Sequence, residues 1–314
     1  MPGLVGNVGQ AARLIAALTI LTAAVPAAAA DFTLTVQHGG LTRTALVHAA
    51  AGAHGPLPVV INLHGGGGSA DSHRAWTRMD AAADRHGFVA VYPNGTGPIS
   101  GKLLVWNAGT CCGRAPAQGV DDVGFLLGVL DALGERVTID RMRVYATGLS
   151  NGSMMAQRLA ADAADRIAAV APVAGAMAMA RFAPARAMPV MHVHSVDDPR
   201  ALYGGGLGPP FPGTSTRVAH APVEDSVRRW ATFDGCPAEP RTWPAVMGAG
   251  GHTATQLAWG PCRDGVEVVL WRLTGGGHVW PGADSYFPKL LGPPTKVIDA
   301  NEEMWKFFAR FTRR

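Results

Sequence analysis

Short apolar runs recur along this chain at the length of β-strands, with amphipathic segments between them. Residues 32–37 and 41–48 alternate between apolar and polar positions around Gly39-Gly40, which predicts an opening β-hairpin. Near-continuous apolar runs, typical of strands buried on both faces, follow at 57–63, 88–92, 167–173 and 188–194. A β-branched and aromatic run at 142–147 and two more runs at 253–259 and 266–273 complete the expected strands.

Helix-favouring segments lie between these strands. They are expected at 75–86, after a cap at Asp121-Asp122, and at 153–160, 223–233 and 301–311. Strands that alternate with helices predict an α/β protein with a mostly parallel central sheet, covered by helices on both faces. The long segment 93–119 has no pattern of its own, and such loops are often functional.

The first 30 residues have the pattern of a secretory signal. Arg13 is their only charge, an apolar run at 14–25 follows it, and Ala28-Ala29-Ala30 gives a small-residue cleavage pattern. The apolar run is too short to span a bilayer comfortably, so we expect no retained membrane anchor. The sequence therefore predicts a signal peptide at 1–30, removed near Ala30, and one catalytic domain at 31–314 in a secreted or periplasmic protein.

The charge and the cysteine pattern argue against two classes of protein, those that bind nucleic acids and those with structural zinc. The formal net charge of +4 comes without any lysine- or arginine-rich block, so we expect no nucleic-acid partner. No cysteine stands in a paired C-x-x-C arrangement, which argues against structural zinc. Cys236 and Cys262 lie in loop-like surroundings, and we predict a disulfide between them. The adjacent Cys111 and Cys112 could form a disulfide, stay reduced or pair elsewhere.

Residues 148–152, with the sequence G-L-S-N-G, match the G-x-S-x-G pattern of a nucleophile elbow. A predicted strand precedes the motif and a predicted helix follows it, as the elbow requires. Such a sharp turn exposes the hydroxyl of Ser150 above the sheet edge, and glycines let the backbone segments approach closely. A glycine-rich turn without chemistry is the alternative.

A serine nucleophile needs a base and an acid, and other strand ends offer both. Of the histidines that follow the acid candidates, His278 alone comes after a strand and within a glycine-rich loop. Asp197 and Asp198 both follow the 188–194 strand, so either could be the acid. The nucleophile candidate Ser150 comes first in the chain, the acid candidates second and His278 last, which is the order expected of α/β-hydrolases.

The glycine run after His64 predicts half of an oxyanion hole. Backbone amides of Gly66 and Asn151 are the expected donors to the developing negative charge. We interpret His64 as an orienting or packed residue and not as a second base.

Two further features have a structural and a functional reading. His192 and His194 share one side of their strand and could bind a metal, but without a third ligand a buried pair is the better interpretation. Trp106 and Trp280 neighbour the predicted site and could flank a substrate or simply pack in the core. We expect no metal and no cofactor.

These motifs resemble the secreted esterases grouped with polyhydroxybutyrate depolymerases and bacterial feruloyl esterases. The matching segments are L-H-G-G at 63–66, W-N-A-G at 106–109 with C-C-G at 111–113, D-D-V-G-F-L at 121–126, G-L-S-N-G at 148–152 and G-G-H-V-W-P-G at 276–282. The resemblance implies an α/β-hydrolase fold and metal-free ester hydrolysis through an acyl-enzyme. Its H-G-T-x-D-P pattern corresponds to 194–199 and selects Asp198, although Ser195 stands where the family usually has glycine.

The leading hypothesis is a monomeric serine carboxylesterase with Ser150, Asp198 and His278 as its triad. We expect a small or oligomeric ester as substrate, of the feruloyl, acetyl or hydroxyalkanoate type, in preference to crystalline polymer. A peptidase of the same fold and a catalytically silent binding protein are the alternatives.

Overall fold

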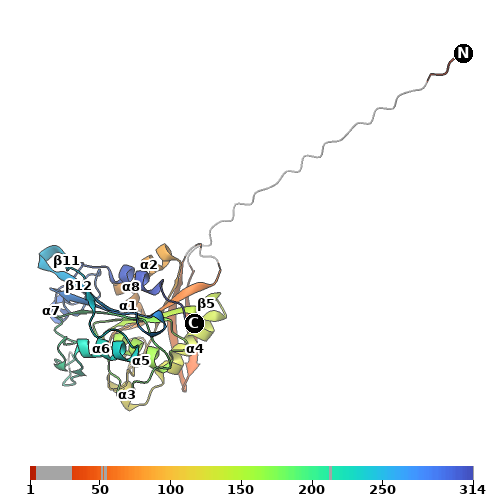
Figure 1. The fold of residues 1–314 in the computed structure, drawn as a ribbon. Coiled ribbons are helices and arrows are strands. Elements are labelled where there is room, and N and C mark those ends of the chain that lie inside the picture. Colours follow the sequence, from red (N-terminus) through yellow and green to blue (C-terminus); the bar gives the residue numbers. More distant parts are fainter. Residues whose placement is uncertain (5–29, 51, 53–54, 212–213, 314) are drawn as a thin grey trace.

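A computed structural model describes residues 1–4, 30–50, 52, 55–211 and 214–313 of the chain (Figure 1). Most of the predicted signal peptide, residues 5–29, lies outside the described residues. Within the described part, no helix is long and apolar enough to cross a membrane.

One sheet of eleven strands organises the molecule, in the order β1-β2-β4-β3-β5-β6-β7-β13-β12-β10, with β11 beside β12. The central strands β4, β3, β5, β6, β7 and β13 run parallel, and the strands on either side of them pair antiparallel. The strands of this sheet are β1 (Ala30–His38), β2 (Leu41–Ala49), β3 (Leu57–Leu63), β4 (Val89–Pro93), β5 (Ile139–Leu149), β6 (Ala169–Val173), β7 (Val190–Ser195), β10 (Arg241–Thr242), β11 (Val246–Met247), β12 (Thr253–Trp259) and β13 (Val268–Thr274).

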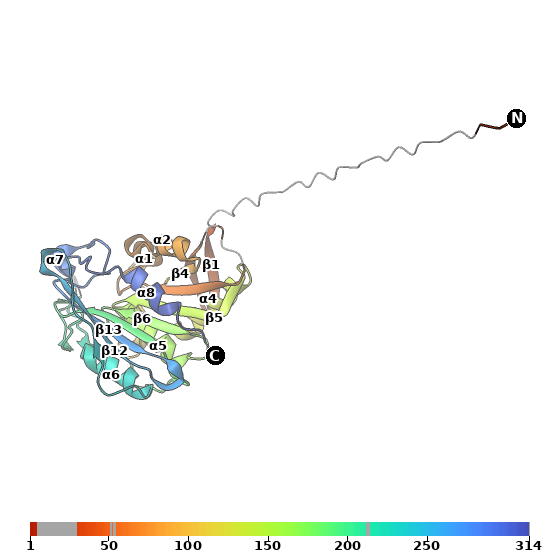
Figure 2. The ribbon, with the colours of Figure 1, turned by 45° about the horizontal axis from the view of Figure 1, so that its top comes forward.

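Helices cover both faces of this sheet (Figure 2). Each face has its own hydrophobic core. Because side chains alternate along a strand, Val59 and Ile61 of β3 pack into one core while Val60 packs into the other. The first core lies under α4 (Asp122–Gly134), α5 (Asn151–Asp162) and α6 (Val223–Phe233). The second lies under α1 (Ala70–Thr77), α2 (Met79–His86) and α8 (Ala300–Phe308).

The expected opening hairpin, the parallel sheet and the cap of Asp121 on α4 are confirmed. The helix expected at 75–86 is instead two helices. Arg78 adopts a left-handed conformation, with φ of 53°, and its amide donates to Arg74 O, which ends α1 before α2 begins. The chain turns there, so one predicted helix becomes two short ones.

Short elements occur in segments where the sequence has no clear period. The loop 94–121 contains the four-residue α3 (Arg114–Ala117), and 199–222 contains a small hairpin of β8 (Gly206–Leu207) and β9 (Ala219–His220). The 3-10 turns η1 (Ala249–Gly251) and η2 (Arg263–Gly265) and the short helix α7 (Pro288–Leu291) complete the described elements. Since parallel strands end at the same edge, the loops after β3, β5, β7 and β13 lie together there.

Candidate active site

Ser150 lies on a strained turn between β5 and α5, as the motif predicts. Its φ of 58° and ψ of −119° are in a region that residues with a side chain rarely adopt. A Cβ on Gly148 would lie 2.6 Å from the carbonyl oxygen of Leu63, and a Cβ on Gly152 would meet the same oxygen. The two glycines are therefore required because β3 passes close to both sides of the turn.

His278 and Asp198 come together at the ends of neighbouring strands, β13 and β7. The Nδ1 atom of His278 is 2.7 Å from Oδ2 of Asp198, and both side chains are buried. The other carboxylate oxygen of Asp198 accepts the backbone amides of Arg200 and Ala201, at 2.7 and 2.8 Å. The hydrogen bond to the carboxylate leaves Nε2 of His278 as the ring atom able to accept a proton from a nucleophile.

Asp198 is held in its ionised form. Burial by itself would raise the pKa of Asp198, but the charge of His278 and hydrogen bonds from His194 and His278 hold it well below its usual range. The neighbouring Asp197 is exposed, and its carboxylate accepts the amide of Gly275 at 2.7 Å instead. Of the two acid candidates, Asp198 is the one that contacts His278.

The hydroxyl of Ser150 forms no hydrogen bond to any residue that the structure describes, His278 included. Catalytic hydrogen bonds are often long in the free form of an enzyme and tighten when substrate binds. Ser150 is partly exposed, whereas His278 and Asp198 are buried. The nucleophile candidate is therefore the most accessible of these three residues.

The amides of Gly66 and Asn151 are available as donors. Within the described residues neither amide has a backbone or side-chain acceptor. The side chain of Asn151 is occupied by Trp106, because its Oδ1 accepts the Trp106 amide at 2.7 Å and its Nδ2 donates to the Trp106 carbonyl at 3.1 Å. Asn151 therefore fixes the 94–121 loop while its own amide stays free at the start of α5.

His64 orients the loop that contains Gly66. Nε2 of His64 accepts the Gly95 amide at 3.0 Å, so Nδ1 has the proton and donates it to the carbonyl of Gly65 at 2.8 Å. In a trans peptide the C=O and N–H bonds point in opposite directions, so holding the Gly65 oxygen also directs the Gly66 amide. Burial lowers the pKa of His64 to about 4, which keeps the ring neutral.

The pair of His192 and His194 is buried and satisfied within the protein. His192 Nε2 lies 3.1 Å from His194 Nδ1, and His194 Nε2 lies 2.8 Å from the Ala201 carbonyl and 3.3 Å from Oδ2 of Asp198. No cluster of three potential metal ligands exists among the residues that the structure describes. His194 is thus a second contact of the acid.

Trp106 and Trp280 are fully buried, with 0 % of each side chain exposed. Trp106 donates its indole N–H to the carbonyl of His64 at 2.9 Å, and Trp280 donates to Oδ1 of Asn301 at 3.1 Å. Both rings pack in the protein and present no surface to a substrate, in contrast to the possibility that they flank one. This placement supports the packing alternative.

Phe211 was not indicated by the sequence. Its ring lies 3.5 Å from the position of a Cβ on Gly66, so it forms a wall next to this candidate oxyanion donor. The segment 199–222 that contains Phe211 has no periodic pattern from which a contact with Gly66 could be inferred. Only the fold brings it to the site.

Both cysteine pairs are disulfides. The predicted bond between Cys236 and Cys262 joins the end of α6 to the turn after β12. Cys111 and Cys112, whose state the sequence left open, are bonded to each other. Both are buried within the 94–121 loop.

Comparison with known proteins is consistent with this geometry. The family described as "Esterase PHB depolymerase" matches residues 43–237. NocK of Nocardia uniformis subsp. tsuyamanensis, a candidate esterase, is 32 % identical over 86 % of this chain and 80 % of its own. Feruloyl esterase B of Piromyces equi is 29 % identical over 70 % of this chain, a match that spans only 39 % of that longer protein.

Among solved structures, an acetyl xylan esterase from Aspergillus awamori is similar in fold. It is 14 % identical, the alignment covers 88 % of this chain and 99 % of that one, and the TM-score is 0.60. The match of residues 43–237 covers more than half of the chain, and it includes the elbow and the acid. The chain therefore belongs to the polyhydroxybutyrate depolymerase family of esterases, and it is an ester hydrolase with the α/β-hydrolase fold.

Proposed function

We propose that Ser150, His278 and Asp198 form a catalytic triad that hydrolyses carboxylic esters through an acyl-enzyme. The observation that supports this most directly is the 2.7 Å hydrogen bond between His278 and the buried carboxylate of Asp198, at the sheet edge where Ser150 follows β5. Unpaired amides of Gly66 and Asn151 at the same edge are the proposed oxyanion hole.

In the first half-reaction, Oγ of Ser150 attacks the ester carbonyl while Nε2 of His278 accepts the hydroxyl proton. Asp198 stabilises the resulting imidazolium and holds its Nδ1–H. The carbonyl oxygen becomes an oxyanion, which the two amides bind, and its collapse expels the alcohol with the proton from His278. A water molecule then repeats these steps on the acyl group and restores the free serine.

For the substrate we propose a small or oligomeric ester of the feruloyl, acetyl or hydroxyalkanoate type. The family description and the names of the relatives include all three classes, and feruloyl esterases are the most frequent among these relatives. Phe211 beside Gly66 gives the site an apolar wall. Parallel assays on methyl ferulate, acetylated xylan and hydroxybutyrate oligomers would rank the classes by kcat/KM.

We further propose that residues 1–30 are a signal peptide and that the mature protein, residues 31–314, is one exported monomeric domain. The two disulfides support an oxidising compartment. Mass spectrometry of the protein recovered outside the cytoplasm tests this, since the mature chain should begin at Asp31. A protein that keeps its first 30 residues would contradict the proposal.

Ser150→Ala tests the proposed nucleophile. We expect the variant to lose turnover of a p-nitrophenyl ester and labelling by a fluorophosphonate probe, while its melting temperature stays near that of the wild type. Retained turnover would refute the triad. A wild-type protein that the probe does not label would favour the silent binding protein, and preferential cleavage of peptides would favour the peptidase.

A further inference from the structure

His278 lies directly after three glycines, residues 275–277, that follow β13. Glycine backbones have more conformational freedom than any other, and Gly275 adopts a φ of 82°. A proton acceptor must nevertheless be held within about 0.5 Å of its productive position. The loop therefore needs restraints from outside its own sequence.

Part of this restraint comes from the segments that follow His278. The amide of Gly277 donates to the carbonyl of Pro293 at 2.9 Å, and the amide of His278 donates to the carbonyl of Leu291 at 2.6 Å. These bonds fix the far side of the loop. They leave the first two glycines, which connect it to β13, to be held by other groups.

The turn at the end of β7, residues 195–198, holds these first two glycines. The hydroxyl of Ser195 donates to the carbonyl of Gly276, and the carboxylate of Asp197 accepts the amide of Gly275 at 2.7 Å. Ser195 is only 4 % exposed, so water cannot readily replace its bond. Its Oγ also accepts the Asp197 amide at 3.3 Å, which connects the two contacts.

We propose that Ser195 and Asp197 are positioning residues. They hold the loop 275–278 in the place where His278 can form its hydrogen bond to Asp198. The proposal rests on the proposed triad, because it assigns these residues to the Asp198–His278 pair and not to the substrate. The turn that contains the acid would then also fix the backbone leading to the base. Ser195 stands where the resemblance leads us to expect glycine, and a glycine has no hydroxyl to form this contact.

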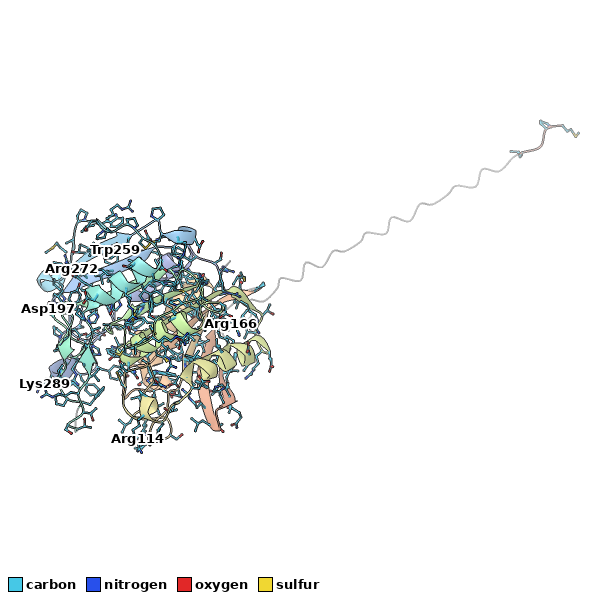
Figure 3. All side chains as sticks on the ribbon, turned by 60° about the horizontal axis from the view of Figure 1, so that its bottom comes forward. Arg114, Arg166, Asp197, Trp259, Arg272 and Lys289 are labelled. Atoms are coloured by element: carbon cyan, nitrogen blue, oxygen red, sulfur yellow. A yellow bond between two sulfur atoms is a disulfide. The ribbon has the colours of Figure 1, made fainter. Side chains whose placement is uncertain are left out.

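The exposed position of Asp197 fits this role and not that of the acid. Asp197 lies at the same edge of the molecule as Arg272 and Lys289 (Figure 3). Its contact with Gly275 needs only an oxygen acceptor, which an asparagine side chain also provides. The effect of Asp197→Asn therefore distinguishes the two roles. A positioning residue keeps its function as an amide, whereas a catalytic acid loses it.

The test compares Ser195→Ala, Asp197→Ala and the double variant with the wild type on a p-nitrophenyl ester. We expect each single change to lower kcat by about 10-fold and the double change by about 100-fold, with KM within about twofold, because the base is displaced while substrate contacts remain. Asp197→Asn should keep most of the wild-type kcat. The downfield proton resonance of His278 Nδ1–H should broaden in the alanine variants.

Ser226→Ala is the matched control. Ser226 is also buried, and its hydroxyl accepts the Met177 amide at 3.0 Å and donates to the Pro222 carbonyl at 3.2 Å. The Ser226→Ala variant loses a comparable buried hydroxyl, but Ser226 has no contact with the turn 195–198 or the loop 275–278. Its kcat and its Nδ1–H resonance should therefore remain those of the wild type. An active wild type with unchanged kcat in the double variant would overturn this inference alone. An inactive, unlabelled wild type would instead refute the triad.

Discussion

Two adjacent aspartates follow β7, and their surroundings assign them different chemistry. Asp198 accepts four hydrogen-bonding contacts in a buried position, while Asp197 is exposed and contacts a backbone amide. Asp198→Asn should lower kcat by about 10⁴-fold, because an amide cannot stabilise the imidazolium or enforce the tautomer of His278. Asp197→Asn should cost far less. If the two variants exchange these effects in steady-state assays, the acid assignment is wrong.

The sequence could nominate Ser150, His278 and the aspartate pair because each follows an apolar strand, where α/β proteins place their chemistry. It could not separate the roles of Trp106 and Trp280, since a tryptophan near a loop can face either the core or the site. The structure decides by the burial of the two rings and by the partners of their indole N–H groups, which are a buried carbonyl and a partly buried amide side chain. In the sequence, Ser195 is only a departure from the family pattern, because its partner Gly276 is 81 residues away.

At the scale of elements, the elbow depends on close packing of α5 against β3. A Cβ on Gly152 would meet the carbonyl oxygens of Leu63 and His64, the latter at 2.6 Å. Replacing glycine by alanine in a helix usually stabilises it by about 1 kcal/mol. For Gly152→Ala we expect the opposite sign, a loss of about 1–3 kcal/mol or more in the free energy of unfolding, because the backbones must separate.

Gly134→Ala is the control for this prediction, and urea unfolding monitored by circular dichroism is the measurement. Gly134 is the last residue of α4, and a Cβ there would come too close only to the guanidinium end of Arg141, which can move aside, while Ile139 would lie at an ordinary contact distance of 3.7 Å. We expect this variant to remain near wild-type stability. A Gly152→Ala protein as stable as the Gly134→Ala protein would contradict the packing argument.

Element positions were predictable wherever the apolar period was long. The ranges of α6 and β12 agree with the sequence prediction, and most other strands differ by a few residues at their ends. The failures are local: the left-handed Arg78 divides one expected helix, and the β8–β9 hairpin pairs only two residues of each strand. Neither a single residue with positive φ nor a pairing of two residues per strand produces a periodic pattern of apolar residues, so the sequence could not predict them.

At the scale of the whole molecule, one buried carboxyl far from the chemistry should control stability against pH. Asp234, at the end of α6, is 0 % exposed, and its Oδ1 accepts the Met188 amide at 3.1 Å. Its Oδ2 has no partner among the described residues. Burial raises the pKa of Asp234 to about 7, against its hydrogen bond from Met188, so the folded protein holds this proton more tightly than the unfolded chain does.

The direction of the pH effect follows from that difference. The unfolded chain releases the Asp234 proton near its reference pKa of 3.8, whereas the folded protein keeps it until about pH 7. Stability from this group is therefore complete below pH 4 and falls as pH rises to 7, by up to about 4 kcal/mol. Asp234→Asn imitates the protonated acid. In urea unfolding, the free energy of unfolding of the variant should therefore increase relative to that of the wild type from pH 5 to pH 8. Asp225→Asn, on the exposed face of the same helix, should follow the wild-type slope, and parallel curves for all three proteins would show that Asp234 is ionised when folded.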